Sequence, residues 1–297
     1  MGNADIARGR GRAGTPASIV REMASRDWDR MAGDYFEAVV SPLRDGVPGP
    51  LLRVLDAIPR ARRLTAGDLG CGTGTLLPAL ADRFHRVEAI DFSAAMLARA
   101  RARCRQRHVR LHRADLANLG KFHGRLDVAI AVNSVLTPDP ARLDRIFAEL
   151  AAVLRPGGML IAVFPPMEAI LYQGFLIHER ERRHNPTSAR QRTNRILERA
   201  KYDFVHGTYN EHGGAQKFFY DFELRHRLRS AGFRRIRIGR VPYAWGDAVG
   251  GYESFPGEPP MWDWLVQAVR DTSAHDRADD RASAARAAGR RRRPRHQ

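Results

Sequence analysis

Closely spaced glycines between a strand-like and a helix-like segment constrain this chain more than any other feature. The stretch Asp68-Leu69-Gly70-Cys71-Gly72-Thr73-Gly74-Thr75-Leu76 follows the apolar run Leu64–Leu69 and leads into the helix-like segment Leu76–Phe84. Glycine permits positive φ angles, a tight turn and the close approach of a ligand to backbone N–H groups at a helix N-terminus. The stretch therefore predicts a ligand-binding loop between a strand and a helix, with a carboxylate or phosphate favoured there.

A second acidic position follows at the distance expected for a nucleoside site. The strand-like segment Val87–Ile90 ends in Asp91, 21 residues past Gly70. A carboxylate at the end of the second strand can accept hydrogen bonds from both hydroxyls of a ribose. Together, the loop and Asp91 predict a cofactor that contains adenosine.

The glycine spacing distinguishes between two such cofactors. A dinucleotide site needs G-x-G-x-x-G or G-x-G-x-x-A, so that a pyrophosphate can lie on the helix dipole. Here the glycines run G-x-G-x-G, and Thr75 stands where the third glycine or alanine would fall. Asp68 before the loop would repel a pyrophosphate and attract an ammonium or a sulfonium. S-adenosylmethionine therefore fits better than NAD, and NAD-linked oxidoreduction is a distant alternative.

Strand-like and helix-like segments alternate from about residue 62 to residue 165. Short apolar runs separated by helices of about ten residues are typical of βαβ units, and hence of a parallel sheet with helices on both faces. Leu126–Val132 is nearly all apolar, which predicts a central strand. The other expected elements are helix Leu76–Phe84, strand Val87–Ile90, helix Ala94–Cys104, strand Val109–Arg113, helix Arg142–Leu154 and strand Met159–Phe164.

The pattern changes after Phe164, where we expect an insertion rich in Arg and His. Tyr202–Tyr209 and Gln216–Phe222 alternate aromatic with polar residues around His212-Gly213-Gly214, which predicts an antiparallel hairpin. Helix Glu223–Ser230, ended by Gly232, and strand Phe233–Ile238 would then return the chain to the sheet.

The length of 297 residues allows one large domain or two small ones, and we predict one domain over residues 23–271. It would comprise an N-terminal lid (23–60), a cofactor-binding core (62–165), an insertion or substrate region (166–215) and a return to the sheet (216–271). Flanking segments poor in large apolar residues are expected to be a flexible basic arm (1–22) and a disordered Arg-rich tail (272–297).

The net charge of +17 would ordinarily indicate a polyanionic partner. Residues 1–21 contribute +3 and residues 281–297 contribute +7, which leaves +7 for the rest of the chain. Only three of the 50 basic residues are lysines, so a general bias toward arginine also accounts for much of the excess. Nucleic-acid binding by the termini therefore stays an alternative that we do not favour.

Several segments resemble class I S-adenosylmethionine-dependent methyltransferases of the small-molecule type. The resemblance implies a Rossmann-like α/β fold: a doubly wound, mostly parallel seven-stranded sheet with an antiparallel last strand and an insertion after the fifth strand. The matching segments, in the family's order, are Asp68–Gly74, Asp91–Leu97, Ala114–Leu116, Leu154–Leu160 and Glu223-Leu224 with Ala231–Phe233.

The resemblance also implies roles for individual residues of a site for S-adenosylmethionine. The loop backbone would line the methionine moiety, Asp68 would orient its amino group, and Asp91 would hold the ribose. Phe92 and Met96 would pack on the adenine, Asp115 would accept from its amino group, and Asn133 would face the sulfonium. The cofactor-binding residues implied are Asp68, Gly70, Cys71, Gly72, Gly74, Asp91, Phe92, Met96, Asp115, Leu116 and Asn133.

The catalytic residues are not identifiable from the sequence. Transfer from a sulfonium is an in-line displacement that needs mainly positioning, with a general base where the acceptor carries a proton. The loop Ala131–Pro138 lacks the Asn/Asp-Pro-Pro-aromatic motif of related enzymes that methylate planar amines, so such acceptors are disfavoured. Candidate bases, each also typical of a solvated surface, are Tyr172, His178, His184, His206, Tyr209 and His212.

Aromatic residues flank the predicted core on both sides. Trp28, Tyr35 and Phe36 would form either a lid over the cofactor or simple packing against the sheet. The aromatic run near the C-terminus would either wall a substrate pocket or clamp the core. This run comprises Tyr243, Trp245, Tyr252, Phe255, Trp262 and Trp264.

Composition restricts the remaining classes of protein. No apolar run approaches the ~18 residues of a spanning helix, and the N-terminus lacks the apolar part of a secretory signal. We therefore expect a soluble, cytoplasmic protein without a membrane partner. Cys71 and Cys104 are too few for a disulfide framework or a Cys-rich zinc site, so we expect no metal. A non-catalytic module that binds S-adenosylmethionine is the other alternative, and the sequence indicates no oligomeric state.

Overall fold

The computed structural model describes residues 22–31, 49–198, 201–211, 214–243, 245 and 254–272. The expected basic arm and Arg-rich tail fall almost wholly outside the described residues. So do Tyr35, Phe36, His212 and Tyr252, which the sequence had singled out.

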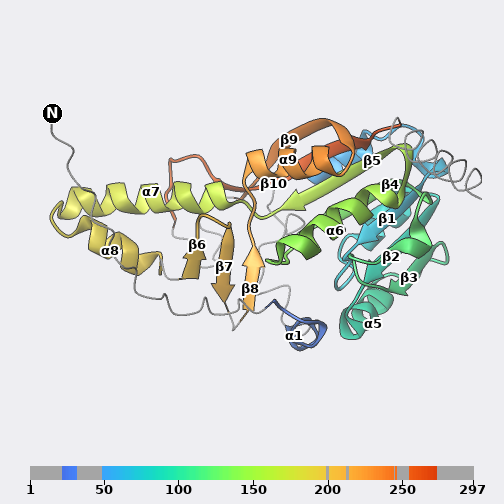
Figure 1. Ribbon diagram of the computed structural model, residues 1–297, viewed down its shortest axis with the longest axis horizontal. Coiled ribbons are helices and arrows are strands. Elements are labelled where there is room, and N and C mark those ends of the chain that lie inside the picture. Colours follow the sequence, from blue (N-terminus) through green and yellow to red (C-terminus); the bar gives the residue numbers. More distant parts are fainter. Residues whose placement is uncertain are drawn as a thin grey trace, which may run out of the picture.

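A seven-stranded sheet forms the centre of the molecule, with the strand order β3-β2-β1-β4-β5-β10-β9 (Figure 1). The first five strands are parallel, and β10 is antiparallel to both β5 and β9. The expected doubly wound, Rossmann-like fold with an antiparallel last strand is therefore confirmed. The strands are β1 (Thr65–Leu69), β2 (Arg86–Asp91), β3 (Val109–Arg113), β4 (Leu126–Val132), β5 (Leu154–Phe164), β9 (Phe233–Tyr243) and β10 (Met261–Arg270).

Helices cover both faces of this sheet, and each face has its own apolar cluster. One cluster joins α3 (Pro50–Asp56), α4 (Leu77–Arg83) and α5 (Ala94–Arg103) to the sheet. The other joins α6 (Pro140–Ala152) and α9 (Asp221–Ser230) to the opposite face. Short 3₁₀ turns lie at Ala61–Arg63 and Gly120–Phe122. Local chemistry fixes the helix starts: Ser93 caps α5 through the N–H of Met96, and Asp139 caps α6 just before a proline.

Two strand predictions need correction. The helix predicted over Arg142–Leu154 is α6, which ends at Ala152, and β5 begins at Leu154 and not at Met159. The segment after Ile238 also continues as strand, because β9 runs on to Tyr243 and pairs with β10. The sequence of Met261–Arg270 does not indicate a strand because it follows two prolines directly and is apolar except at Asp263, Gln267 and Arg270, so no period of two appears.

The insertion after β5 has two parts. Figure 1 shows a helical arm that projects away from the main sheet: α7 (Met167–His184) with α8 (Ala189–Ile196) packed beside it. A small antiparallel sheet follows, made of β6 (Tyr202–Asp203), β7 (Thr208–Glu211) and β8 (Gly214–Lys217).

The predicted hairpin corresponds to β7 and β8, with different bounds. Tyr202–Tyr209 is not one strand but contains β6, a turn and the start of β7. Phe218–Phe222 leaves the small sheet, and Phe219 bridges to Pro166 at the start of the insertion. The turn at residues 212–213 lies outside the described residues.

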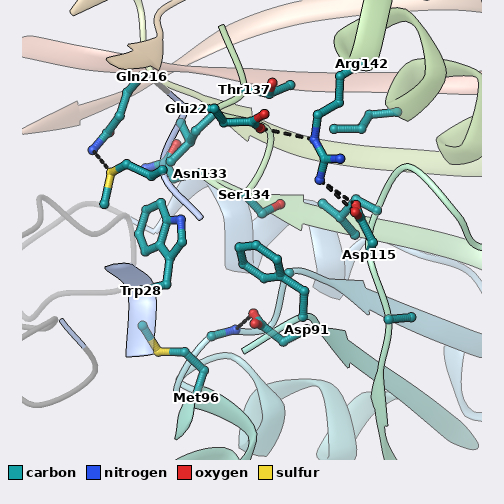
Figure 2. Close-up of a pocket in the computed structure, with 18 of the residues that line it drawn as sticks. Glu22, Trp28, Asp91, Met96, Asp115, Asn133, Ser134, Thr137, Arg142 and Gln216 are labelled. Carbon is teal, nitrogen blue, oxygen red and sulfur yellow. Dashed lines mark hydrogen bonds and ion pairs between the residues drawn. The ribbon is translucent and has the colours of Figure 1, made fainter. Parts of the chain in front are cut away.

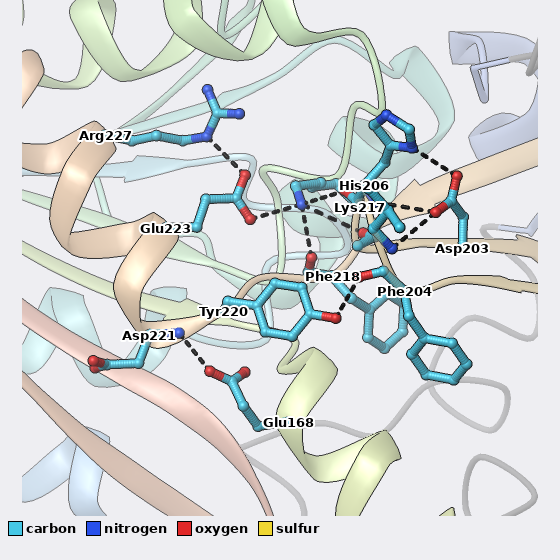
Figure 3. Close-up of polar contacts among 12 residues, drawn as sticks. Glu168, Asp203, Phe204, His206, Lys217, Phe218, Tyr220, Asp221, Glu223 and Arg227 are labelled. Carbon is cyan, nitrogen blue, oxygen red and sulfur yellow. Dashed lines mark hydrogen bonds and ion pairs between the residues drawn. The ribbon is translucent and has the colours of Figure 1, made fainter. Parts of the chain in front are cut away.

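A buried lysine attaches the small sheet to the core (Figure 3). Lys217 is 4% exposed, and its Nζ donates to the carbonyl oxygen of His206 (2.7 Å) and to Oε2 of Glu223 in α9 (2.8 Å). Burial lowers the pKa of Lys217, although the pairing with Glu223 opposes this. Tyr220 donates to the carbonyl oxygen of Phe204 (2.6 Å) and fixes the turn between β6 and β7.

The N-terminal segment 22–31 lies against two parts of the fold. Glu22 forms a parallel bridge with Ala215 in β8. In α1 (Ser25–Met31), Asp29 accepts hydrogen bonds from the hydroxyl of Ser93 and the N–H of Ala95 at the start of α5. No helix in the described part of the chain is both long and apolar enough to cross a membrane.

Candidate functional site

A pocket opens at the carboxyl ends of the central strands, where the strand order reverses between β1 and β4 (Figure 2). Open α/β sheets bind their ligands at this place. The loops after β1, β2, β3 and β4 form its floor, and the space inside, counted to its open mouth, is about 800 Å³.

The three glycines of the loop after β1 have different surroundings. Gly70 and Gly72 line the pocket with φ angles of +80° and +51°. A Cβ atom added at Gly70 would lie 2.3 Å from Cβ of Ser134, whereas one at Gly72 would meet nothing within 4 Å. Gly74 does not line the pocket; it lets the loop pack on α5, where an added Cβ would lie 2.8 Å from Cα of Ala100. Only a side chain at position 72 would therefore project into open space.

Asp68 lies near the end of β1 and is not among the residues that line the pocket. It is 3% exposed, and its Oδ2 has no hydrogen-bond partner among the described residues. Burial, and after it the nearby charge of Asp91, raises the pKa of Asp68 to about 7. A buried carboxylate with an unsatisfied oxygen is costly unless a ligand completes it. The ammonium of S-adenosylmethionine fits this position.

Asp91 lines the pocket at the end of β2 and organises the loops around it. Its two oxygens accept hydrogen bonds from the N–H groups of Gly72 (2.9 Å) and Ser93 (2.8 Å). Burial raises the pKa of Asp91, although these backbone hydrogen bonds lower it. Each carboxylate oxygen has two acceptor sites, so Asp91 retains capacity for two ligand hydroxyls.

Apolar side chains form the next part of the wall. Phe92, Met96 and Leu116, which the resemblance assigns to the adenine, all line the pocket. Cys71 does not: its thiol is buried, and burial raises the pKa well above the ordinary value, so the thiol stays protonated.

Arg142 is a pocket residue that the sequence did not reveal (Figure 2). Its Nη2 lies 2.7 Å and 2.8 Å from the two oxygens of Asp115, and its Nε lies 3.1 Å from Oε1 of Glu22. Asp115 also accepts from the N–H of Ala117, as a turn-capping residue does. Arg142 lies in the first turn of α6, and nothing in the local sequence marks it as a pocket residue. Arg142 ties the N-terminal segment to the loop after β3.

Asn133 lines the pocket where β4 ends, and its φ of +47° turns the chain sharply there. Its Nδ2 donates to Oδ2 of Asp263 in β10 (3.0 Å), and the hydroxyl of Tyr243 donates to the same oxygen. The sequence predicts Asn133 at the site but gives no sign of its partner Asp263 or of Tyr243 behind it, which follow Asn133 by more than 100 residues.

The far side of the pocket is closed by segments outside the cofactor-binding core. Met23 and Trp28 come from the N-terminal segment, and Ala215 and Gln216 come from β8. Gln216 donates from Nε2 to the sulfur of Met23 (3.3 Å), which joins the two segments. Trp28 therefore lies at the pocket, which agrees with the expectation of a lid and not with simple packing against the sheet.

The candidate bases with described positions lie away from this pocket. Tyr172 donates to the carbonyl oxygen of Pro259, His178 contacts Thr193, and His206 contacts Asp203. Tyr209 stacks on Tyr202, and His184 ends α7. The late aromatic residues do not line it either: Trp262 packs on Trp264 and Tyr172, and Arg240 lies 3.8 Å above the ring of Trp262. These aromatic residues clamp the core.

Comparisons with known proteins agree with this geometry. Residues 67–158 match the model of the methyltransferase domain family. A search of curated proteins finds no match. A structure of an S-adenosylmethionine-dependent methyltransferase from Mesorhizobium loti is similar, with a TM-score of 0.54 and 20% identity over 77% of this chain and 100% of that chain.

Two archaeal structures show the same fold. A chain of the complex between the Haloferax volcanii Trm112 methyltransferase activator and a methyltransferase has a TM-score of 0.55 and 17% identity, over 82% of this chain and 98% of that one. A Methanosarcina mazei S-adenosylmethionine-dependent methyltransferase has a TM-score of 0.50 and 16% identity, over 75% and 97%. Residues 67–158 thus match a methyltransferase domain, and the strand order and the pocket at its switch point agree with the Rossmann-like fold of S-adenosylmethionine-dependent methyltransferases.

Proposed function

We propose that this pocket holds S-adenosylmethionine in a defined orientation and that the enzyme methylates a small molecule. In this proposal Asp68 pairs with the ammonium of the methionine moiety, the backbone at Gly70 and Gly72 gives it room, and Asp91 accepts from the ribose hydroxyls. The observation that carries the cofactor assignment is the buried, unsatisfied Oδ2 of Asp68 beside a loop whose Gly72 faces open space.

The adenine end is assigned to the apolar wall formed by Phe92, Met96 and Leu116. Asp115 stands at the edge of this wall, where the resemblance places an acceptor for the adenine amino group. Both of its oxygens contact Arg142, so in this chain the amino group would share Asp115 with an arginine. Arg142 would thereby hold the carboxylate in place.

The closed far side of the pocket supports a small acceptor. Met23 and Trp28 on one segment and Gln216 on another line the pocket, and a hydrogen bond joins the two segments, which favours an acceptor small enough to fit beside them. The sulfonium supplies an activated methyl group. The chain's own residues therefore need to position the acceptor in line and exclude water, which can account for several kcal/mol of the barrier.

Incubation with methyl-labelled S-adenosylmethionine and a size-fractionated cell extract tests this proposal. We expect the wild type to transfer label to the fraction of small metabolites and the Gly72→Val variant to transfer none. Label only in protein or nucleic acid would contradict a small acceptor. Binding of the cofactor without transfer to any fraction would instead favour the non-catalytic alternative.

A nucleic-acid acceptor is the second candidate because of the net charge of +17. The charge that favours it lies largely in the two termini, whereas the pocket carries Glu22, Asp91 and Asp115 against the single cation Arg142 among its described lining residues. Such a pocket suits a cationic cofactor better than a phosphate chain. Methylation of nucleic acid that falls steeply with salt and is lost on removal of residues 281–297 would support this candidate.

A further inference from the structure

The carboxylate of Asp263 in β10 accepts a hydrogen bond from Asn133, a side chain at the pocket. Asn133 donates from Nδ2 to Oδ2 of Asp263 at 3.0 Å, and Tyr243 at the end of β9 donates its hydroxyl to the same oxygen. Asp263 and Tyr243 are each 7% exposed, and neither lines the pocket. Asn133 does line it, and Figure 2 shows its side chain among those of the pocket wall.

The chemistry of a carboxylate fixes which end of the Asn133 amide faces Asp263. An ionised carboxylate only accepts hydrogen bonds, so the amide nitrogen must face it and the amide oxygen must face elsewhere. That oxygen, Oδ1 of Asn133, is buried and has no hydrogen-bond partner in the described part of the chain. Buried acceptors are nearly always paired, so an unpaired one in a pocket wall indicates a ligand group that donates to it.

On the basis of the proposed function, we propose that Asp263 is a positioning residue that, with Tyr243, locks Asn133 so that Oδ1 accepts a hydrogen bond from a proton-bearing nucleophile. The methyl acceptor is then a hydroxyl or an amine, and not a thioether or a group without a proton. The N–H or O–H of the acceptor donates to Oδ1, which directs its lone pair toward the methyl carbon. The bond from the nucleophile to that carbon forms, the carbon–sulfur bond breaks with its electrons going to sulfur, and the displaced proton passes to solvent.

The lock depends on pH because it depends on the charge of Asp263. Burial outweighs the hydrogen bonds from Tyr243 and Asn133, which lower the pKa, so the pKa of Asp263 is raised to about 6. Both of these hydrogen-bond donors are neutral. Above this pH the carboxylate holds the amide nitrogen by charge-assisted hydrogen bonds. Below it the protonated carboxyl becomes a donor itself, and the fixed orientation of Asn133 is lost.

Two cofactor analogues isolate this contact without knowledge of the acceptor. S-adenosylhomocysteine lacks the methyl group, whereas sinefungin has an amine-bearing carbon in place of the methyl-bearing sulfonium. Sinefungin therefore places an N–H donor close to the site of transfer. The affinity of the full-length protein for each analogue is measured by calorimetry from pH 5 to pH 7.5. The affinity for sinefungin is then divided by the affinity for S-adenosylhomocysteine to give a ratio. The methionine ammonium is common to both analogues, so the effect of Asp68 cancels in the ratio.

We expect Asp263→Asn to weaken sinefungin binding by about tenfold with little change for S-adenosylhomocysteine, because a hydrogen bond from a charged donor is lost. The wild-type ratio should fall below pH 6, and the ratio for Asp263→Asn should not depend on pH. Tyr243→Phe removes one donor to the carboxylate, so it should move the midpoint of the wild-type curve to higher pH. Glu88→Gln, another buried carboxylate variant, is the control and should match the wild type.

If neither variant changes the ratio while S-adenosylhomocysteine still binds, this inference is overturned but the proposed function is not. Tyr243→Phe keeps Asp263 in place, so it gives this answer even where Asp263→Asn does not fold. Absence of S-adenosylhomocysteine binding to the wild type would overturn the proposed function and the inference with it.

Discussion

Asp68 makes cofactor binding depend on pH in a way that can be calculated from its surroundings. Its pKa is raised from 3.8 to about 7, first by burial and then by Asp91, so the folded protein keeps the carboxyl protonated over much of the acidic range. The contribution of Asp68 to stability is therefore full below about pH 4 and is lost as the pH rises toward 7. The complete loss amounts to at most about 4 kcal/mol for a shift of this size.

Binding of an ammonium next to Asp68 requires the ionised form. With a pKa of about 7, about 3% of the carboxyls are ionised at pH 5.5 and about 75% at pH 7.5, so the apparent affinity for S-adenosylmethionine should rise about 25-fold over this range. The upper limit keeps the amino group of the cofactor protonated, since such groups titrate near about pH 8. Calorimetry at several pH values measures the slope.

Asp68→Asn provides the matched comparison. We expect this variant to bind the cofactor weakly at every pH and to lose the slope. Its ligand-free form should also melt at a higher temperature than the wild type at pH 8, because no buried charge remains, but not at pH 4. A wild-type affinity that does not change between pH 5.5 and pH 7.5, or Asp68→Asn with the same slope, would refute this reasoning.

Three further predictions concern other parts of the chain. Asp91→Ala should weaken cofactor binding by roughly 1.5–3 kcal/mol through the loss of charge-assisted hydrogen bonds; unchanged affinity in calorimetry would exclude the ribose role. Lys217→Met should lower the free energy of unfolding by about 2 kcal/mol, because the carbonyl oxygens of His206 and Phe218 lose their donor and the half-buried Glu223 keeps only Arg227 as a partner; chemical denaturation measures this, and a loss below about 0.5 kcal/mol would show that the lysine is dispensable. Deletion of residues 281–297 should leave transfer to small metabolites unchanged in the labelled-methyl assay, and a large loss of that transfer would point to the charged tail as part of the site.

Sequence patterns predicted the part of the fold in which local chemistry and position along the chain agree. The glycine loop, Asp91 and the alternation of apolar strands with short helices all lie within residues 62–165, and their elements occur where expected. The hydrophobic pattern is less informative where residues are buried by contacts with segments that are distant in the sequence. Met261–Arg270 is buried along most of its length because β5 and β9 flank it, and a period of two does not appear in such a strand.

The same limit applies to the pocket. Residues that follow the strand ends were predictable because parallel strands bring their carboxyl ends to one edge. Arg142, Glu22 and Gln216 reach the pocket from a helix surface, the N-terminal segment and the insertion, and no spacing in the sequence relates them. Asp263 lies among aromatic residues that gave no sign of a polar partner. Its role depends on a contact with Asn133 across 130 positions of the chain.

The most direct test of the account is a calorimetric titration of the full-length protein with S-adenosylmethionine at pH 7.5, beside the variants Gly72→Val and Gly124→Val. Both glycines have positive φ angles, and an added Cβ atom meets nothing within 4 Å at either, but only Gly72 lines the pocket. We expect one bound cofactor for the wild type and for Gly124→Val, and none for Gly72→Val in a protein that still melts cooperatively. Equal binding by Gly72→Val, or no binding by the wild type, would contradict it.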